Sequence, residues 1–570
     1  MSHRKNRKRR KKSKRIFIPE TGISAKVMVD FEQIFGFRLT QKEISEKFRN
    51  ADIGELLFAI ARLNAIFEAG IDNRSLLNSV ISRIHGNSPT LTFLKGLKEY
   101  VDQGQVPYGP HILLNIAKRI LAEGDSSTWM KTRPFDDPYS ISLALYLATT
   151  LSNSMNPLSH EYVLLETVQN GTFYKQIKTG AVLQRSYECY WNLASQSYRF
   201  KSSEFIDIPA LYLRITGIDI RMFIKFMSSI ILAYSPLLAN VEEFLWSNRL
   251  AKDISVIVER FGSQEVERLL GEMSISVVEF NRDFQDTVYK RWDFSYFRKK
   301  PLVHVGELFY PLYSRFVLDY IWDGLYWRVF DGLQKHEKNK YQVFFGRIFE
   351  AYCHDLLGSI GTKIEGEIIH EFEYKQGVLS PDAFISLGTD LVVIDFKSKR
   401  LKMNDTLIKG DINSFIDDMR KMFIEPAKKI YQHLKNMSQL GDRIDPDVTT
   451  ARRIHAIIVT QGAFTSIRQM YQKIDEEIRQ EGLYNELPIV HWHLFDIDEF
   501  ETFIGIIDNG ISLVNILNQK SQSKYRYLSF SDFLAYTRVK LQFASVIQQR
   551  GKVLTNEVMG ILTKNDESEK

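Results

Sequence analysis

Two carboxylates and a lysine lie at the ends of neighbouring apolar segments in the C-terminal half of the chain. Pro381-Asp382 opens a short apolar run, and thirteen residues later Asp395 interrupts a Val/Ile-rich run, with Lys397 two positions further on. Side chains at i and i+2 of a strand point to the same face, so we expect Asp395 and Lys397 to project together. Burying both groups costs hydration free energy, which either a divalent cation or an ion pair can offset.

A helix and a sheet must position these groups. Glu350 lies in a segment with helical spacing, where the apolar residues Phe345, Ile348, Phe349, Tyr352, Leu356 and Leu357 recur at three- and four-residue intervals. The pattern predicts helices over 341–358, 411–438 (kinked at Pro426) and 465–481, and strands over 364–374, 379–387, 390–397, 453–460 and 488–495. Helix-to-strand crossings after Lys397 favour an α/β core with a mixed sheet.

Over roughly residues 341–505 the chain resembles the PD-(D/E)XK, or restriction-endonuclease-like, phosphodiesterases. The resemblance is carried by Glu350, Pro381-Asp382 and Asp395-Phe396-Lys397. It implies that Glu350, Asp382 and Asp395 hold Mg²⁺, with Mn²⁺ as a substitute, and that Lys397 assists the attacking water and the developing phosphorane charge. It also implies a nuclease acting on nucleic acid, DNA rather than RNA, in a bacterial defence or restriction-type system; repair is the other role.

The expected fold class is therefore α+β multidomain, with a largely helical N-terminal half followed by an α/β restriction-endonuclease-like domain around a mixed central sheet. The rival hypothesis is a nucleic-acid-binding or scaffold protein that keeps this fold without cutting, because a fold does not by itself determine an activity. The enzyme is favoured because all four positions hold the residue types that the chemistry needs.

Two further features of this region need an interpretation. Glu373-Tyr374-Lys375 is a second acid-x-lysine triplet, but its Pro-Asp follows it, in the wrong order. The helix over 411–438 carries Tyr431 and Gln432; some members of the resembled family use a Gln or a Tyr there to align water or DNA. These two are auxiliary candidates, with a solvated helix face as the alternative.

The positive charge of the chain is concentrated in its first residues. The net charge is +6 over 570 residues, and residues 1–15 contain ten Lys or Arg and no acid, which leaves 6 − 10 = −4 for the rest. Such a segment cannot bury a core. It predicts a disordered arm over 1–19 that either binds nucleic acid or is only solvated; its candidate contacts are Arg4, Lys5, Arg7, Lys8, Arg9, Arg10, Lys11 and Lys12.

The remaining domains are predicted from composition and periodicity. Residues 20–290 read as a helical domain for protein partners or self-association, 291–340 as an aromatic-rich connector, 341–510 as the nuclease-like domain and 511–570 as a C-terminal helical segment. The aromatics of the connector either stack on bases or form a core, and the core is favoured. Two distant cysteines indicate a reducing compartment, and no stretch is apolar enough to span a membrane, so we expect a cytoplasmic protein.

Four acids, Asp496, Asp498, Glu499 and Glu501, follow a predicted strand and open a predicted helix. Carboxylates at a helix N-terminus complement its dipole and its free N–H groups. We therefore expect all four to act as capping acids.

Overall fold

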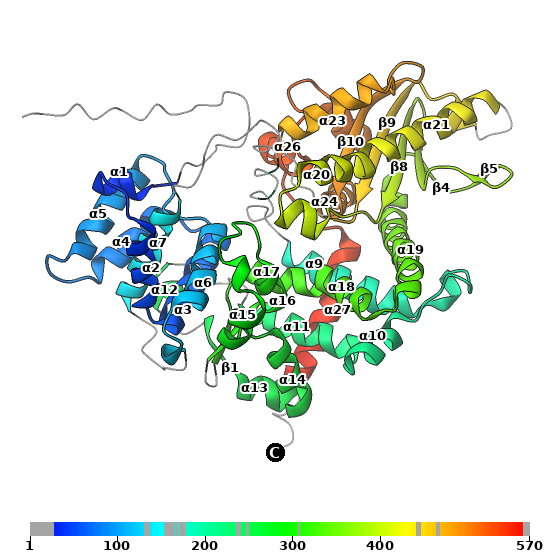
Figure 1. The fold of residues 1–570 in the computed structure, drawn as a ribbon. Helices are drawn as coiled ribbons and strands as arrows, with labels where there is room; N and C mark the ends of the chain where they lie inside the picture. Colours follow the sequence, from blue (N-terminus) through cyan, green and yellow to red (C-terminus); the bar gives the residue numbers. More distant parts are fainter. Residues whose placement is uncertain are drawn as a thin grey trace, which may run out of the picture.

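The computed structural model describes residues 28–129, 137–152, 165, 169, 178–234, 241–246, 250–305, 308–440, 446–462 and 468–562. Helices dominate the chain up to residue 332, and a five-stranded mixed sheet follows (Figure 1). The expected α+β class is confirmed. In the described segments, no helix has the length and apolar character needed to cross a membrane.

The helical half, residues 31–332, is built from short amphipathic helices. Its helices are α1 (Phe31–Phe35), α2 (Gln41–Arg49), α3 (Ile53–Glu68), α4 (Asn73–Ser82), α5 (Pro89–Asp102), α6 (Pro110–Glu123), α7 (Pro138–Leu151), α9 (Thr179–Tyr187), α10 (Ile208–Thr216), α11 (Ile220–Tyr234), α12 (Val241–Trp246), α13 (Ile254–Phe261), α14 (Ser263–Met273), α15 (Val277–Asp283), α16 (Ser295–Lys299), α17 (Ser314–Asp319) and α18 (Leu325–Gly332). A small antiparallel sheet joins β1 (Lys252–Asp253), β3 (Leu308–Pro311) and β2 (Leu302–Val305).

The aromatic-rich segment 291–340 is part of the core. The rings of Phe297, Phe309 and Tyr326 are among those buried there. The π-helical turn η7 (Tyr320–Gly324) lies between α17 and α18. The Arg400 guanidinium, from beyond β8, lies 4.0 Å from the centre of the Tyr326 ring and 3.0 Å from the Asp323 carboxylate. These buried rings therefore pack against the segment that carries the predicted chemistry.

The sheet domain, residues 335–508, contains the predicted helices and the predicted strands 390–397, 453–460 and 488–495. The predicted strands 364–374 and 379–387 are each divided into two short strands, one in the five-stranded sheet and one in a separate hairpin. The elements of this domain are α19 (Lys335–Ser359), β4 (Glu367–His370), β5 (Glu373–Lys375), β6 (Val378–Leu379), β7 (Ala383–Leu387), β8 (Asp390–Lys397), α20 (Ile412–Met419), η10 (Arg420–Ile424), α21 (Glu425–Leu440), α22 (Pro446–Thr449), β9 (Arg453–Thr460), α23 (Arg468–Gln480), β10 (Ile489–Asp496) and α24 (Ile497–Asp508). Within the predicted helix 411–438 the interruption is a π-helical turn at Arg420–Ile424, just before Pro426. Proline lacks the N–H that a regular turn requires.

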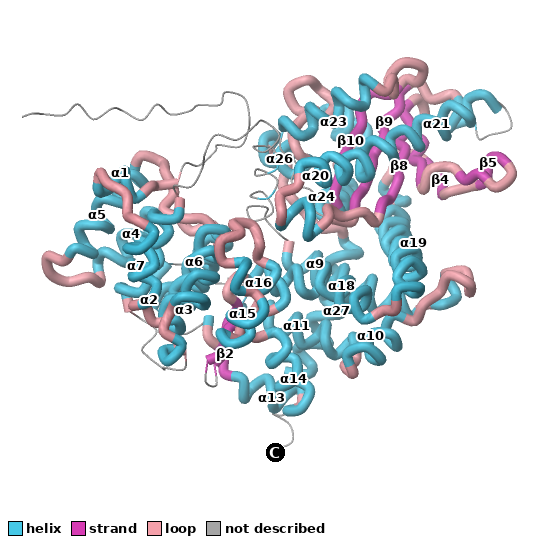
Figure 2. The backbone as a smooth tube through the Cα atoms, in the orientation of Figure 1, coloured by secondary structure: helices cyan, strands magenta, loops and turns pink. Residues whose placement is uncertain are grey.

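The sheet has the strand order β10-β9-β8-β7-β4, with β8, β9 and β10 parallel and β7 and β4 antiparallel to their neighbours. One face packs on the helices α20, α21 and α23, which cross the strands in Figure 1. The other face packs on α19 and α24 and is continuous with the core of the helical half. Figure 2 shows the strands of this sheet at one end of the molecule, whereas β2 of the small sheet lies apart from them in the helical half.

Three helices complete the chain: α25 (Leu513–Lys520), α26 (Phe530–Thr537) and α27 (Ser545–Leu562). The last of these, red in Figure 1, packs against α9 and α11 of the helical half. Arg221 and Lys225 on α11 lie 3.0 and 2.8 Å from the Glu557 carboxylate. The end of the described chain is therefore tied to the helical half by apolar packing and by charge.

Candidate functional site

A hairpin places Asp382 opposite Asp395. Strands β7 and β8 join through a tight turn in which Gly388 has φ 73°, a left-handed conformation that favours glycine. The register runs from Leu387 opposite Asp390 to Ala383 opposite Ile394, so one step further brings the two aspartates level. The Asp382 Oδ2 atom accepts a hydrogen bond of 2.5 Å from the backbone N–H of Phe396. The turn thus positions two carboxylates distant in sequence.

Asp395 and Lys397 share the sheet face that packs on α20, α21 and α23. Alternate residues of β8 divide between the two cores: Val393 packs on those helices, whereas Ile394 and Phe396 pack on the opposite side. The prediction that Asp395 and Lys397 project together is confirmed. The Lys397 Nζ atom lies 2.6 Å from Asp395 Oδ2, and the two side chains are 22% and 5% exposed. An ion pair shielded from water forms at the end of β8.

The three groups perturb one another strongly. Burial, then repulsion from Asp395, raises the pKa of Asp382 to about 8, although Lys397 acts in the opposite direction. Burial lowers the pKa of Lys397, but attraction to Asp395 and then to Asp382 outweighs it, and the net shift is upward. One ammonium cannot neutralise two buried carboxylates. The two carboxylates are hard oxygen ligands of the kind that a divalent cation takes, and such an ion would favour the ionised form of Asp382.

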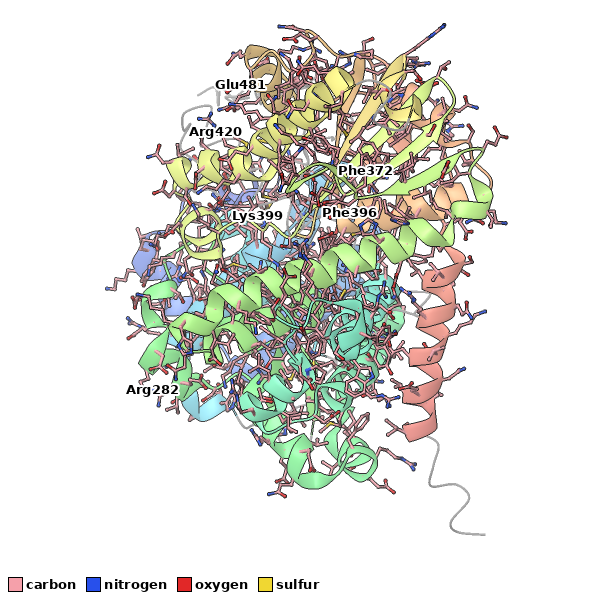
Figure 3. The ribbon with its side chains drawn as sticks, turned by 90° about the vertical axis from the view of Figure 1, so that its right-hand side faces the viewer. Arg282, Phe372, Phe396, Lys399, Arg420 and Glu481 are labelled. Carbon is pink, nitrogen blue, oxygen red and sulfur yellow. The ribbon has the colours of Figure 1, made fainter. Side chains whose placement is uncertain are left out.

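Glu350 approaches the same groups from α19. Its carboxylate influences the pKa of both Asp382 and Lys397, and its Oε2 accepts a hydrogen bond of 3.1 Å from Arg347 Nη1. One turn before it, Gly346 faces Ser398: a Cβ atom there would lie 3.0 Å from the Ser398 hydroxyl oxygen. The absent side chain lets α19 approach the end of β8. In Figure 3, Phe372, Phe396 and Lys399 lie between the ribbons of α19 and α21.

Sequence reasoning missed Glu371, which the structure brings to the same place. It follows β4, where His370 pairs with Ala383, and its backbone N–H donates to the Asp382 carbonyl at 3.1 Å. Burial, then the negative charge of Glu350, raises its pKa. Neither a motif nor a period marks Glu371 in the sequence. The antiparallel pairing of β4 with β7 is what places it beside Asp382.

Helix α21 faces the site with different residues from those predicted. The charge of Lys429 acts on Glu371, and the charges of Asp395 and Lys397 act on His433, one turn further along the helix. The Tyr431 hydroxyl is buried and accepts a hydrogen bond from the Glu486 N–H, and Gln432 is exposed and donates to Asn436. Neither Tyr431 nor Gln432 is brought to the carboxylates.

The second acid-x-lysine triplet lies on a separate hairpin. Glu373 and Lys375 belong to β5, which pairs only with β6 in the described sheets, and both side chains are exposed. The Glu373 Oε1 atom accepts the N–H of Gly377 within that hairpin. Within this triplet, Glu373 therefore stabilises the turn of its own hairpin. The basic arm, residues 1–19, lies outside the described residues.

Three buried histidines lie on the opposite face of the sheet. His491 and His493 on β10 are joined by His455 on β9, whose Nδ1 is 3.4 Å from His493 Nε2. Burial is the largest cause of the lowered pKa of all three rings. No cluster of three or more His, Cys, Asp or Glu side chains in the described segments is arranged to hold a metal ion. These histidines are neutral groups of the core.

The four acids at the start of α24 divide into two pairs. Asp496 and Glu499 form a capping box, as expected, and Glu499 Oε1 also accepts the Phe530 N–H at 2.7 Å. Asp498 and Glu501 instead lie 3.0 and 2.8 Å from the Arg185 guanidinium on α9. Asp498 lies in the first turn of α24, as expected, whereas Glu501 lies beyond it, and both residues join the sheet domain to the helical half.

Comparison of the whole chain with protein-family models, with curated proteins and with solved structures finds no match.

Proposed function

We propose that the protein is a metal-dependent nuclease of the PD-(D/E)XK type that hydrolyses phosphodiester bonds, with DNA as the favoured substrate. One observation supports this most: Asp382 and Asp395 oppose each other across one hairpin, and the Lys397 ammonium lies 2.6 Å from Asp395. Carboxylates that can hold a metal ion, with an ammonium beside them, can support a metal-assisted attack by water on a phosphodiester.

Each residue has a distinct role in this proposal. Asp382 and Asp395 would hold Mg²⁺ or Mn²⁺, with Glu350 completing the acidic set. When bound, the ion polarises the attacking water and offsets charge on the phosphoryl oxygens. The Phe396 N–H orients the Asp382 carboxylate. The Lys397 ammonium, held beside Asp395, is placed to donate to the water or to a phosphoryl oxygen as negative charge develops. Mg²⁺ ordinarily keeps several waters, so two direct carboxylates are sufficient.

The test is cleavage by the purified full chain of linear DNA, circular plasmid DNA and RNA, in Mg²⁺, Mn²⁺ or EDTA. We expect cleavage in either metal and none in EDTA, and the plasmid distinguishes an endonuclease from an exonuclease. Asp395→Asn should abolish cleavage because it removes a metal ligand. Glu373→Gln, in the exposed triplet, is the matched control and should cut at the wild-type rate. Failure of the wild type to cut any of these substrates would favour the scaffold hypothesis instead.

The biological role is a further part of the proposal. A nuclease with a separate helical half suits a bacterial defence or restriction-type system in the cytoplasm, where that half would recognise a partner or a second copy of the chain. Expression in a bacterial host challenged with phage, comparing wild type with Asp395→Asn, tests this role. Equal phage yield from both strains would argue against it.

A further inference from the structure

Helix α19 turns one of its faces to the end of β8. Gly346, Glu350 and His354 recur every four residues and therefore lie along one face of the helix. A Cβ atom on Gly346 would lie 3.0 Å from the Ser398 hydroxyl oxygen. The His354 ring meets the Phe396 ring edge-to-face, with 5.3 Å between the ring centres. Because Glu350 lies between these two contacts, it faces the end of the strand that carries the candidate site.

The Glu350 carboxylate is held by Arg347, one turn earlier on α19. The Arg347 Nη1 atom donates to Glu350 Oε2 at 3.1 Å, and among the described residues this is the hydrogen bond that Glu350 accepts. The other two carboxylates of the candidate site have their own partners, a backbone N–H and an ammonium. Carboxylates that bind a metal ion are ordinarily oriented by neighbouring donors of this kind.

The helical half of the molecule holds Arg347 in turn. Glu204 precedes α10, and its Oε2 atom lies 3.5 Å from Arg347 Nε. The backbone of Glu204 is fixed by a turn, in which its N–H donates to the Lys201 carbonyl at 2.9 Å. The guanidinium is thus placed between two carboxylates, one on its own helix and one from the helical half. A single exposed ion pair restricts a long side chain only weakly, whereas two carboxylates at different N–H groups fix the orientation of the guanidinium.

The segment that carries Glu204, the loop before α10 in Figure 1, is packed against α19 by aromatic rings. Phe200 and Phe205 both meet the buried Phe344 ring edge-to-face, with 5.1 and 5.4 Å between the ring centres. Phe344 lies one turn before Arg347 on the helix. This packing sets the distance between the loop and α19, so the Glu204 carboxylate stays within reach of Arg347.

We propose that Arg347 and Glu204 are positioning residues for metal binding, which hold the Glu350 carboxylate toward the ion. The helical half thereby completes the metal site of the sheet domain. Arginine is required because its planar fork of N–H donors reaches both carboxylates at once, which the single ammonium of lysine does not reproduce. The inference rests on the proposed nuclease function, which supplies the metal ion, and adds to it a contribution from the helical half.

The main measurement is the affinity of the full chain for Mn²⁺, by calorimetry in the absence of nucleic acid. Arg347→Lys keeps the positive charge beside Glu350, so the repulsion between that charge and the ion is retained and the orientation of the carboxylate is lost. We expect Mn²⁺ binding to be about tenfold weaker, the lower end of the range for a donor that orients a metal ligand. Glu204→Gln should weaken binding about threefold, the worth of one part-exposed ion pair.

Double variants separate positioning from a general effect of charge or folding. Glu350→Ala should itself weaken Mn²⁺ binding, and adding Arg347→Lys or Glu204→Gln to it should have no further effect, because both residues act through the Glu350 carboxylate. The matched control is Arg199→Lys. Arg199 donates to both oxygens of Asp355, at 3.0 and 2.7 Å, and so joins the same loop to a different face of α19. This control should bind Mn²⁺ as tightly as wild type.

Single-turnover cleavage at saturating Mn²⁺ is the second readout. We expect Arg347→Lys to be about tenfold slower than wild type, since a misplaced ligand weakens catalysis as well as binding. Arg199→Lys should cut at the wild-type rate.

The outcomes separate this inference from the proposed function. If wild type cuts and Asp395→Asn does not, but Arg347→Lys binds Mn²⁺ as tightly as wild type, the inference is refuted and the nuclease stands. The same holds if Arg347→Lys weakens binding equally with and without the Glu350 carboxylate. If wild type binds Mn²⁺ but cuts nothing, the nuclease proposal fails, and the Mn²⁺ affinities decide the inference by the same criteria. A wild type that binds no Mn²⁺ would overturn both.

Discussion

The buried Asp395 and the partly buried Asp382 face each other, and Lys397 neutralises only one charge between them. Such an arrangement is unfavourable for folding alone, because buried like charges repel and one of them must remain protonated. Residues held in an electrostatically costly arrangement are typical of functional sites. At the scale of single residues, therefore, the candidate catalytic groups lie together at the open end of one hairpin.

Lys397→Ala tests whether the ammonium takes part in the reaction. We expect single-turnover cleavage to fall by about 10²-fold, the range for a positioned proton-donating group. Calorimetric Mg²⁺ binding should be retained, because the carboxylates remain and a competing positive charge is lost. Lys375→Ala, at the exposed lysine of the β5 hairpin, is the control and should cut normally. Wild-type rates in Lys397→Ala would contradict the assigned role.

The elements that position these residues are β7, β8 and α19. The hairpin sets the register of the two aspartates, whereas Glu350 depends on how closely α19 packs on the end of β8. That approach is limited at one point, where Gly346 meets Ser398. Gly358, on the last turn of the same helix, has open space around it.

Gly346→Ala should push α19 away from Ser398 and misplace Glu350, lowering the cleavage rate by about tenfold, since misplacement by a fraction of an ångström weakens catalysis measurably. Adding Ser398→Ala removes the hydroxyl oxygen 3.0 Å from the new Cβ and should restore the rate. Gly358→Ala, the matched control, should leave the rate unchanged and stabilise the helix by about 0.5–1 kcal/mol. A double variant as slow as Gly346→Ala would mean that this contact does not position Glu350.

Strands β9 and β10 hold three neutral histidines, which makes the sheet sensitive to acid. Burial lowers the pKa of His491 to about 3 and that of His455 to about 4, and lowers that of His493 as well. Between about pH 4 and the ordinary histidine pKa of about 6.5, the unfolded chain therefore binds more protons than the folded one. The free energy of unfolding should fall with falling pH, by about 1.4 kcal/mol per pH unit for each such histidine.

Chemical denaturation at pH 7 and pH 5.5 measures this effect. Between the two pH values we expect His493→Leu to lose about 1 kcal/mol less stability than wild type. Leucine cannot bind the proton that His493 takes up when the chain unfolds, so one source of the pH dependence is removed. His85→Leu, an exposed histidine, should lose as much as wild type. Identical losses in all three proteins would mean that His493 is not held neutral.

At the scale of the whole molecule, the two halves are joined by a buried polar network as well as by apolar packing. The Arg185 guanidinium on α9 contacts Asp498 and Glu501 on α24, and the Tyr352 hydroxyl on α19 donates to Glu501 at 2.7 Å. Arg185 and Glu501 are 2% and 1% exposed. Removing one member leaves the other charge buried without compensation.

Arg185→Met should therefore lower the free energy of unfolding by about 3–5 kcal/mol, the cost of breaking a buried pair from one side. Urea denaturation followed by tryptophan fluorescence measures it. Arg38→Met, in an exposed pair with Glu32, is the control and should keep the wild-type midpoint. An Arg185→Met midpoint equal to wild type would show that packing alone joins the halves.

The amino-acid sequence by itself determined the helices and strands and the placement of Asp395, Lys397 and Glu350 on them. Alternation in β8 placed Asp395 and Lys397 on one face, and the helical period placed Glu350 on α19. These features follow from φ/ψ periodicity and short-range turn chemistry, which act over a few residues. The register of the β7–β8 hairpin is set by the turn at Gly388, where the backbone is left-handed. This turn also depends on only a few residues.

Only the tertiary structure decided which distant groups meet these residues. Glu371 reaches Asp382 through strand pairing, and no sequence motif marks it. Asp498 and Glu501 looked like capping acids, yet they pair with Arg185 more than 300 residues earlier. Such contacts depend on how whole faces pack, which a pattern within one segment does not contain, because burial and charge compensation are properties of the assembled core.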